Sequence, residues 1–239
     1  MPNSREEQQM AEPRARRAAR PREEVFAAAR TAIAEHGLAK LTMAGLGKQL
    51  QMSAGHLLYY FGSKDQLLLE TLHWSEEQLG ERRRAALARP GATGRERLAA
   101  YAGLYLPEGP GDPRWILWVE VWGRSPASAE IRQGQQAIEV PWHADLVGVI
   151  EDGVATGEFA LAGARPGPAP ESAPTGPDAS STGPESAPAG RGSVQDVATQ
   201  IRALLDGFAV PIAIGLPGAR REDALAQVAA VTTALLGPR

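Results

Sequence analysis

Apolar residues recur at helical spacing along most of the chain. Val25, Ala29 and Ile33 share one face of a predicted helix over residues 22–36, and Gly37 is well placed to end it in the left-handed conformation. No segment shows the alternation and hairpin turns that are typical of β-strands. The pattern therefore predicts an all-α protein.

Capping residues mark the starts of the next three helices. Ser63, with Gln66 three residues later, is predicted to form a capping box. Gly45 and Gly47 lie inside the first of these helices and each costs about 1 kcal/mol relative to Ala, so packing must hold that helix. The three predicted helices run from Thr42 to about Leu50, from Ser53 to about Tyr60, and from Ser63 towards Ala88.

Five further helices are predicted after Pro90. Pro141 lies inside one of them and removes its hydrogen bond to Ala137, so we expect a kink there. The five predicted helices cover residues 94–106, 112–123, 127–155, 193–214 and 220–236.

Two segments lack any apolar pattern. Residues 1–13 are polar and of mixed charge, which predicts a disordered lead-in. In the segment 162–192, 26 of 31 residues are Gly, Pro, Ala, Ser or Thr, and the sequence Pro-Glu-Ser-Ala-Pro occurs twice. Such a segment has too little apolar surface to offset the entropy of ordering, so it is predicted to be a disordered linker.

Composition places the chain among ordinary globular proteins. Its 239 residues are 43% hydrophobic and 22% charged, no stretch is long and apolar enough for a membrane span, and the first twenty residues do not resemble a signal peptide. The absence of cysteine excludes disulfides, thiolate catalysis and cysteine-ligated metals. We expect a cytoplasmic protein that does not interact with a membrane.

Sequence signatures of catalysis are missing. The chain contains no Gly-x-Ser-x-Gly elbow, no glycine-rich phosphate loop and no His-Glu-x-x-His. Its four histidines lack metal-ligand spacing, and the pair Glu139 and His143, one helical turn apart, is a weak signal by itself. We therefore predict no enzyme activity, no metal site and no cofactor.

Charge is segregated along the chain. Residues 11–64 contain nine Lys and Arg against four Asp and Glu, whereas the whole chain has a net charge of -3. A basic region in an acidic protein favours a nucleic acid as its partner, although a solvated basic tail is the alternative. Arg16, Arg17 and Arg20 belong either to such an idle tail or to an arm that reaches a flanking minor groove.

Two short helices joined by a tight turn lie in this basic region. The turn is Gln51-Met52, and in a helix-turn-helix the second helix enters the major groove. The residues from Leu41 through the Ser53-Ala54-Gly55 turn to Tyr60-Phe61-Gly62-Ser63-Lys64-Asp65 resemble the DNA-binding domain of the TetR family of bacterial regulators. The resemblance covers about residues 22–72.

This resemblance implies which residues meet DNA. An imidazole can bond a purine edge, whereas hydroxyls and an ammonium suit phosphate. The alternative for His56 is a surface histidine without a role. Of the two aromatic residues at 60 and 61, we expect Phe61 to be buried and the Tyr60 hydroxyl to be exposed to solvent. The residues implied at base edges are Ala54, Gly55, His56 and Tyr59, and those implied at phosphate are Thr42, Ser53, Tyr60 and Lys64.

The sequence departs from the family pattern at three places. Leu58 stands where a phosphate-binding tyrosine is common, and Gln51 stands where a turn glycine is common. Gly45 and Gly47 stand where alanines are usual. We expect some strain at Gln51 and a modest affinity for the operator.

Several aromatic residues, including four of the five tryptophans, lie between positions 101 and 142. Trp115, Trp118 and Trp122 lie at i, i+3 and i+7, on one face of one helix. Such a stripe is either plain core or, as the resemblance implies, the wall of an effector pocket. The candidate pocket residues are Tyr101, Tyr105, Trp115, Trp118, Trp122 and Trp142, with Glu120, Arg124 or His143 as the polar group.

The resemblance also implies a domain organisation and a mechanism. The segments 153–159 and 204–208 look like the end of helix seven and the start of a dimer-forming helix eight in a common C-terminal branch of the family. We expect a homodimer, usually a repressor, that a small apolar or aromatic effector releases from a pseudo-palindromic operator. The alternative is a helical DNA-binding protein whose C-terminal part only dimerises or binds a protein. The expected parts are a lead-in at 1–13, a DNA-binding domain at 14–72 with its helix-turn-helix at 42–61, an effector-binding and dimerisation domain at 73–161 and 193–239, and the linker at 162–192.

Overall fold

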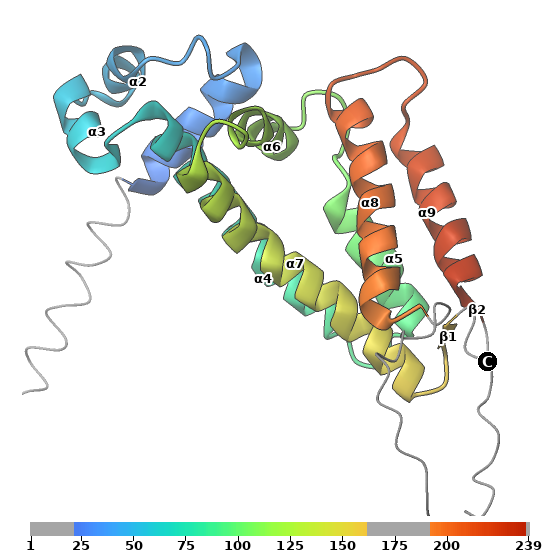
Figure 1. The fold of residues 1–239 in the computed structure, drawn as a ribbon. Coiled ribbons are helices and arrows are strands. Elements are labelled where there is room, and N and C mark those ends of the chain that lie inside the picture. Colours follow the sequence, from blue (N-terminus) through green and yellow to red (C-terminus); the bar gives the residue numbers. More distant parts are fainter. Residues whose placement is uncertain (1–21, 162–191, 238–239) are drawn as a thin grey trace, which may run out of the picture.

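The computed structural model describes residues 22–161 and 192–237. Helices account for nearly all of the regular structure in these ranges, so the predicted all-α class is correct. A group of short helices lies at one end of the molecule and a helical bundle at the other, and the long helix α4 (Lys64–Leu87) joins them (Figure 1). The predicted lead-in, the arginines at 16, 17 and 20, and all but the last residue of the predicted linker lie outside the described residues.

The short helices begin and end at the predicted residues. Residues 22–36 form a helix, and Gly37 follows it with φ of 75°. Thr42 caps α2 (Met43–Leu50) and Ser53 caps α3 (Ala54–Phe61), each by accepting a hydrogen bond from the backbone three residues later. Local side-chain chemistry therefore determines these helix ends.

The two longest helices form the spine of the molecule. Helix α7 (Ala129–Ala155) lies along α4, as Figure 1 shows. Ser63 caps α4, but its own N–H bonds to the Phe61 carbonyl rather than to Gln66, so the predicted capping box is only half formed. Helix α7 continues through Pro141, where the kink stays a prediction.

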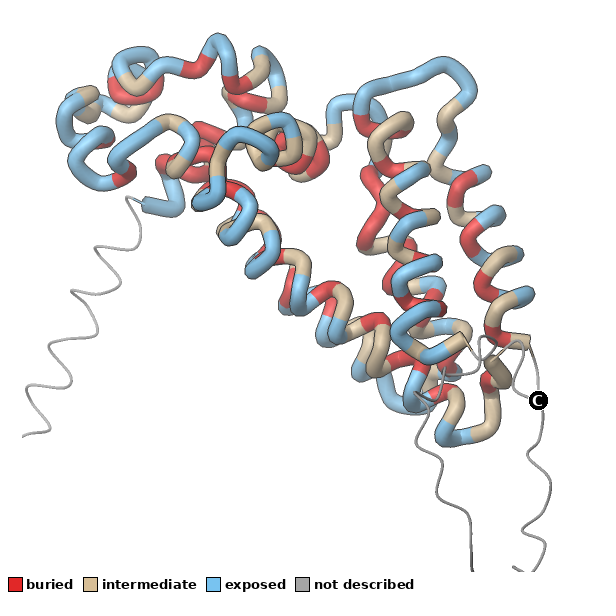
Figure 2. The backbone as a smooth tube through the Cα atoms, in the orientation of Figure 1, coloured by how far each residue is buried: buried red, intermediate tan, exposed pale blue. Residues whose placement is uncertain are grey.

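The bundle is completed by four more helices. Two of them begin with complete capping boxes, Thr93 with Glu96 and Ser193 with Asp196. The bounds are α5 (Gly94–Tyr105), α6 (Pro113–Arg124), α8 (Val194–Ala213) and α9 (Arg221–Leu235), each within two residues of the prediction. Buried positions follow the inner faces of these helices, and exposed ones the outer faces (Figure 2).

One element was not predicted. The two-residue strands β1 (Ala160–Leu161) and β2 (Leu236–Gly237) pair in antiparallel fashion, although the sequence led us to expect no strand. Two residues are too few to show an alternating pattern, and the paired residues are 75 and 77 positions apart in sequence. Within the described ranges, no helix is both long and apolar enough to cross a membrane.

Candidate DNA-binding surface and effector pocket

Helix α3 presents an exposed aromatic face. Leu57 and Phe61 anchor the helix in the core, whereas Tyr59 is 84% exposed and Tyr60 is 55% exposed. The expectation of a buried Phe61 beside a wet Tyr60 is therefore correct. The Tyr60 ring lies edge-on to the rings of His56 and Tyr59, at centroid distances of 4.7 and 5.4 Å. Solvent-facing aromatic and imidazole side chains on one short helix suit contact with base edges.

One residue of the turn before α3 has a left-handed backbone conformation. Gln51 has φ of 56° and ψ of 35°, the conformation that glycine adopts most easily. The expected strain at Gln51 therefore has a definite backbone origin, at about 1–2 kcal/mol for a residue with a Cβ atom.

Gly47 allows the backbone of α2 to lie close to the backbone of the turn that follows it. A Cβ atom at this position would lie 2.5 Å from the Met52 carbonyl oxygen, a backbone atom that cannot move aside alone. From the sequence, Gly47 was expected only to lower the stability of the helix. The structure shows that a glycine is required here, where α2 meets the turn.

Replacing Gly47 with Ala is expected to destabilise the protein by about 1–3 kcal/mol, because the clash outweighs the gain in helix propensity. The matched control is Gly148→Ala in α7, where a Cβ atom meets nothing within 4 Å. That control should be stabilising by up to about 1 kcal/mol. Urea unfolding of both variants measures the difference, and equal effects would contradict the steric explanation.

The residues assigned to phosphate also have partners within the protein. The hydroxyls of Thr42 and Ser53 accept bonds of 3.0 and 3.1 Å from helix N–H groups, and both residues are exposed. The Lys64 ammonium donates to the carbonyls of Leu38 and Leu41, at 3.0 and 3.3 Å. An ammonium has three donors, so one remains for a phosphate. Lys64 also holds the loop before α2 in place.

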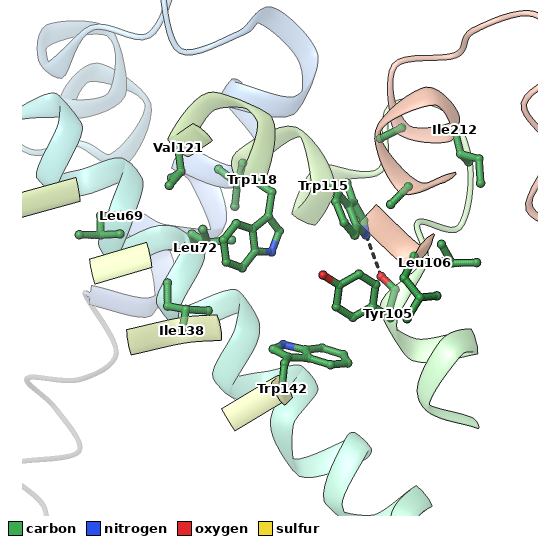
Figure 3. Packing of buried hydrophobic residues seen from close by; sticks show 14 of the residues in the cluster. Leu69, Leu72, Tyr105, Leu106, Trp115, Trp118, Val121, Ile138, Trp142 and Ile212 are labelled. Atoms are coloured by element: carbon green, nitrogen blue, oxygen red, sulfur yellow. Dashed lines mark hydrogen bonds between the residues drawn. The ribbon is translucent and has the colours of Figure 1, made fainter. Parts of the chain in front are cut away.

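Aromatic side chains from three helices meet in the bundle. Figure 3 shows four of these side chains, those of Tyr105, Trp115, Trp118 and Trp142. The rings lie 5.1 to 5.9 Å apart in edge-on, tilted or stacked arrangements. The Trp115 indole N–H donates to the Tyr105 carbonyl at 2.9 Å. We call this set the aromatic cluster: Tyr101 and Tyr105 of α5, Trp115, Trp118 and Trp122 of α6, and Trp142 of α7.

A buried carboxylate, Glu76 of α4, lies against the aromatic cluster. Its two oxygens accept the indole N–H groups of Trp118 and Trp142, at 2.7 and 2.8 Å. The Arg114 guanidinium contacts the same carboxylate at 3.2 Å. Sequence reasoning missed Glu76, because it lies beside Glu77 in a polar stretch and its partners are 38 to 66 positions away.

Three guanidinium groups lie over rings of the cluster. Arg83 lies 4.0 Å from the Trp142 ring centroid, Arg114 lies 5.3 Å from that of Trp115, and Arg202 lies 5.4 Å from that of Tyr105. These distances are within the range of cation–π attraction. The faces of the cluster therefore already hold cations of the protein itself.

The tyrosines of the cluster are kept protonated. Burial raises the pKa of both Tyr101 and Tyr105, so each hydroxyl serves as a donor. Tyr105 donates to the Asp206 carboxylate, and burial raises the pKa of that carboxyl although this bond opposes the rise. The space enclosed by the cluster is about 10 Å³, room for one water molecule at most. In this conformation the cluster is closed.

The three residues that were expected to supply the polar group of the pocket do not line the space inside the aromatic cluster. Glu120 accepts the Leu38 backbone N–H at 2.8 Å, and its other oxygen accepts from Arg124 at 2.7 Å. Arg124 also donates to Asp65 at 3.0 Å. His143, half-buried, does not line the cluster's space. The polar groups at the cluster are instead Glu76, Arg114, Glu139 and Arg202.

Glu120 and Arg124 therefore join two parts of the molecule. We call them the α6 latch, because they tie the helix of three tryptophans to the loop before α2 and to the first turn of α4. These two tied segments flank the α2–α3 pair on both sides in sequence.

Two segments of the chain match the models of known protein families. The family described as bacterial regulatory proteins of the tetR family matches residues 25–71. The C-terminal domain of BetI-type transcriptional repressors matches residues 94–167. None of the curated proteins matched the sequence.

Solved structures share the fold at low sequence identity. A putative transcriptional regulator from Saccharomonospora viridis in complex with choline has 22% identity and a TM-score of 0.71, covering 92% of this chain and 100% of that one. A putative TetR-family regulator from Rhodococcus sp. has 19% identity and a TM-score of 0.64, with coverage of 92% and 100%. A TetR transcription regulator from Haloarcula marismortui has 18% identity and a TM-score of 0.69, with coverage of 91% and 99%.

Proposed function

We propose that this chain, which belongs to the TetR family of bacterial regulatory proteins, is a homodimeric repressor that a small molecule releases from its operator. Its fold is that of TetR-family transcriptional regulators, with a helix-turn-helix for DNA binding. The observation that carries the proposal is the exposed face of α3, where His56, Tyr59 and Tyr60 point to solvent from a helix anchored by buried residues. Surface aromatic residues grouped in this way mark a binding site.

The outer faces of α8 and α9 suit a two-fold dimer. Small exposed residues recur one turn apart on each helix, Ala203 and Gly207 on α8 and Ala226 and Ala230 on α9. Helices with small side chains on their outer faces can approach each other closely. A dimer through these helices would place two copies of α3 in successive major grooves, about 34–36 Å apart.

The effector is proposed to bind at the aromatic cluster. Because the cluster is closed, an effector must displace a side chain, and that movement is transmitted to α6 and its latch. The sequence suggested an apolar or aromatic effector. The choline complex of the Saccharomonospora viridis regulator favours an organic cation with an apolar body. Such a cation would have to displace one of the guanidinium groups that already lie over the rings.

The first test is DNA binding by the full chain. A mobility shift with DNA from its own upstream region, at near-physiological salt with unrelated competitor DNA, should give one dimer-sized complex that resists the competitor. Choline and other organic cations are then added. A coupling of about 2.7 kcal/mol lowers the affinity for DNA about a hundredfold. Competitor-resistant binding that no effector changes would favour the alternative, a C-terminal part that only dimerises or binds a protein.

The α6 latch gives a second prediction. Replacing Glu120 with Ala removes the acceptor of the buried Leu38 N–H, and should lower the free energy of unfolding by about 1–3 kcal/mol. It should also weaken specific DNA binding about three- to tenfold, because the α2–α3 pair is less well oriented. Urea unfolding and the mobility shift measure the two effects. Glu151→Ala, at an exposed site near the end of α7, is the control, and equal DNA binding by both variants would contradict the latch.

A further inference from the structure

A second, larger cavity lies next to the aromatic cluster and shares Tyr101 with it. It measures about 400 Å³ and is walled by α5, α8 and α9, which pack against one another at the far end of the bundle from α3 (Figure 1). We call it the α5–α9 hollow. Its size is within the range of about 300–1,000 Å³ that is typical of sites for small ligands.

Small residues create the hollow. Ala99, Ala102 and Gly103 of α5 face Ala229 of α9 across it. A Cβ atom added at Gly103 would meet nothing within 4 Å, so the position opens onto free space. Larger apolar side chains, such as Leu98, Ile201, Leu225 and Val228, form the remaining wall. An apolar wall of this kind favours an apolar occupant over water.

Two arginines link α9 to α5, one at each end of the hollow. At one end, Arg221 donates to the carbonyls of Gly103 and Leu106, at 2.7 and 2.9 Å. At the other end, Arg95 donates to the Thr233 hydroxyl and the Leu236 carbonyl, at 3.2 and 3.1 Å. These hydrogen bonds fix the positions of α5 and α9 relative to each other at both ends of the hollow.

The charge of the hollow lies at one end. Arg95 is the single charged residue in its described wall, which contains no acidic side chain. Within residues 22–161 and 192–237, both acceptors of the Arg95 side chain are neutral, and a guanidinium has five N–H donors. Donors therefore remain for an anion, and a carboxylate fits the planar guanidinium best.

We propose that the α5–α9 hollow binds an apolar monocarboxylate of about the size of a medium-chain fatty acid. The chain lies between α5 and α9, and the carboxylate pairs with Arg95. This site is separate from the effector site proposed above, and Tyr101 lies between the two.

Tyr101 connects the hollow with the aromatic cluster. Its ring lines the hollow, stacks on Tyr105 at 5.9 Å and lies edge-on to Trp142 at 5.3 Å. Its hydroxyl donates to the Trp142 carbonyl at 3.0 Å. A ligand in the hollow would therefore touch a wall shared with the cluster, and Trp142 fluorescence should respond to it.

The test is calorimetric titration of the full chain, without DNA, with decanoate below its micelle concentration. Decanol and decyltrimethylammonium have the same chain with a neutral and a cationic head. We expect saturable binding of decanoate, at least tenfold weaker binding of decanol, and weaker binding still of the cation. Absence of decanoate binding, or equal binding of all three, would overturn the proposal.

Variants locate the binding. Arg95→Gln should reduce decanoate binding to the level of decanol, and Arg95→Lys should restore part of it because the charge is kept. Gly103→Phe should block the hollow, whereas Gly148→Phe, at an open helical position outside it, should bind as the wild type does. Ala229→Trp fills the hollow from α9 and serves if Gly103→Phe does not fold. Decanoate binding that survives both Arg95→Gln and a folded filling variant would place the ligand elsewhere and refute this site.

Discussion

Replacing Glu76 with Gln is expected to lower the free energy of unfolding by about 3–5 kcal/mol. Both oxygens of Glu76 accept N–H groups, from Trp118, Trp142 and Arg114, and the side chain is buried. An amide would turn a donor towards one of these donors, and it would leave the largely buried Arg114 without its carboxylate. Removing one partner of a buried ion pair carries a cost of this size.

The neighbouring residue provides the control for this prediction. Glu77 is exposed, and its ion-pair partner among the described residues is His73, at the surface. Glu77→Gln should therefore change stability by less than about 0.5 kcal/mol. Urea unfolding followed by tryptophan fluorescence compares the two variants. If Glu76→Gln is no more destabilising than Glu77→Gln, the carboxylate does not organise the aromatic cluster.

The sequence predicted those parts of the structure that depend on near neighbours. Thr42, Ser53 and Ser63 each bond to a backbone N–H three residues later, and a cap of this kind is visible in a short window of sequence. The spacing of the tryptophans likewise predicted that they share one face of α6. Both features are fixed within one or two turns of helix.

The polar partners of the cluster could not be predicted in this way. Glu76 and Arg114 approach each other across 38 positions, and Tyr105 and Asp206 across 101. Only the packing of α4, α5, α6 and α8 brings these residues together, and single-sequence patterns carry no signal of it. The half-formed capping box at Ser63 has a local cause instead, since the Gln66 side chain donates to Glu70, one turn later in the same helix.

The assignment of Glu120 and Arg124 to the effector pocket did have a signal against it. Glu120 is two residues from both Trp118 and Trp122, and residues two apart point to nearly opposite sides of a helix. The helical spacing that places the three tryptophans on one face of α6 therefore places Glu120 and Arg124 on the opposite face. That other face packs against the DNA-binding end of the molecule, where the α6 latch forms.

The largest effect on function is expected from α3. The double variant His56→Ala and Tyr59→Ala should weaken specific operator binding about thirtyfold or more, because each contact to a base edge contributes about 1–3 kcal/mol. Both side chains are exposed, so stability should change by less than about 0.5 kcal/mol. Mobility shifts and urea unfolding separate the two quantities.

Comparing the loss of affinity for operator DNA with the loss for unrelated DNA distinguishes contacts to bases from contacts to the phosphate backbone. Binding to unrelated DNA depends on phosphate contacts and should be nearly unchanged in the double variant, so the ratio of specific to unspecific affinity falls. Tyr59→Phe keeps the ring and removes the hydroxyl, which separates a hydrogen bond to a base from contact with a thymine methyl group. Val140→Ala, at an exposed apolar site of α7, is the matched surface control and should bind as the wild type does. An equal loss on operator and unrelated DNA would mean that the face of α3 positions the protein on the backbone and does not determine the sequence that it binds.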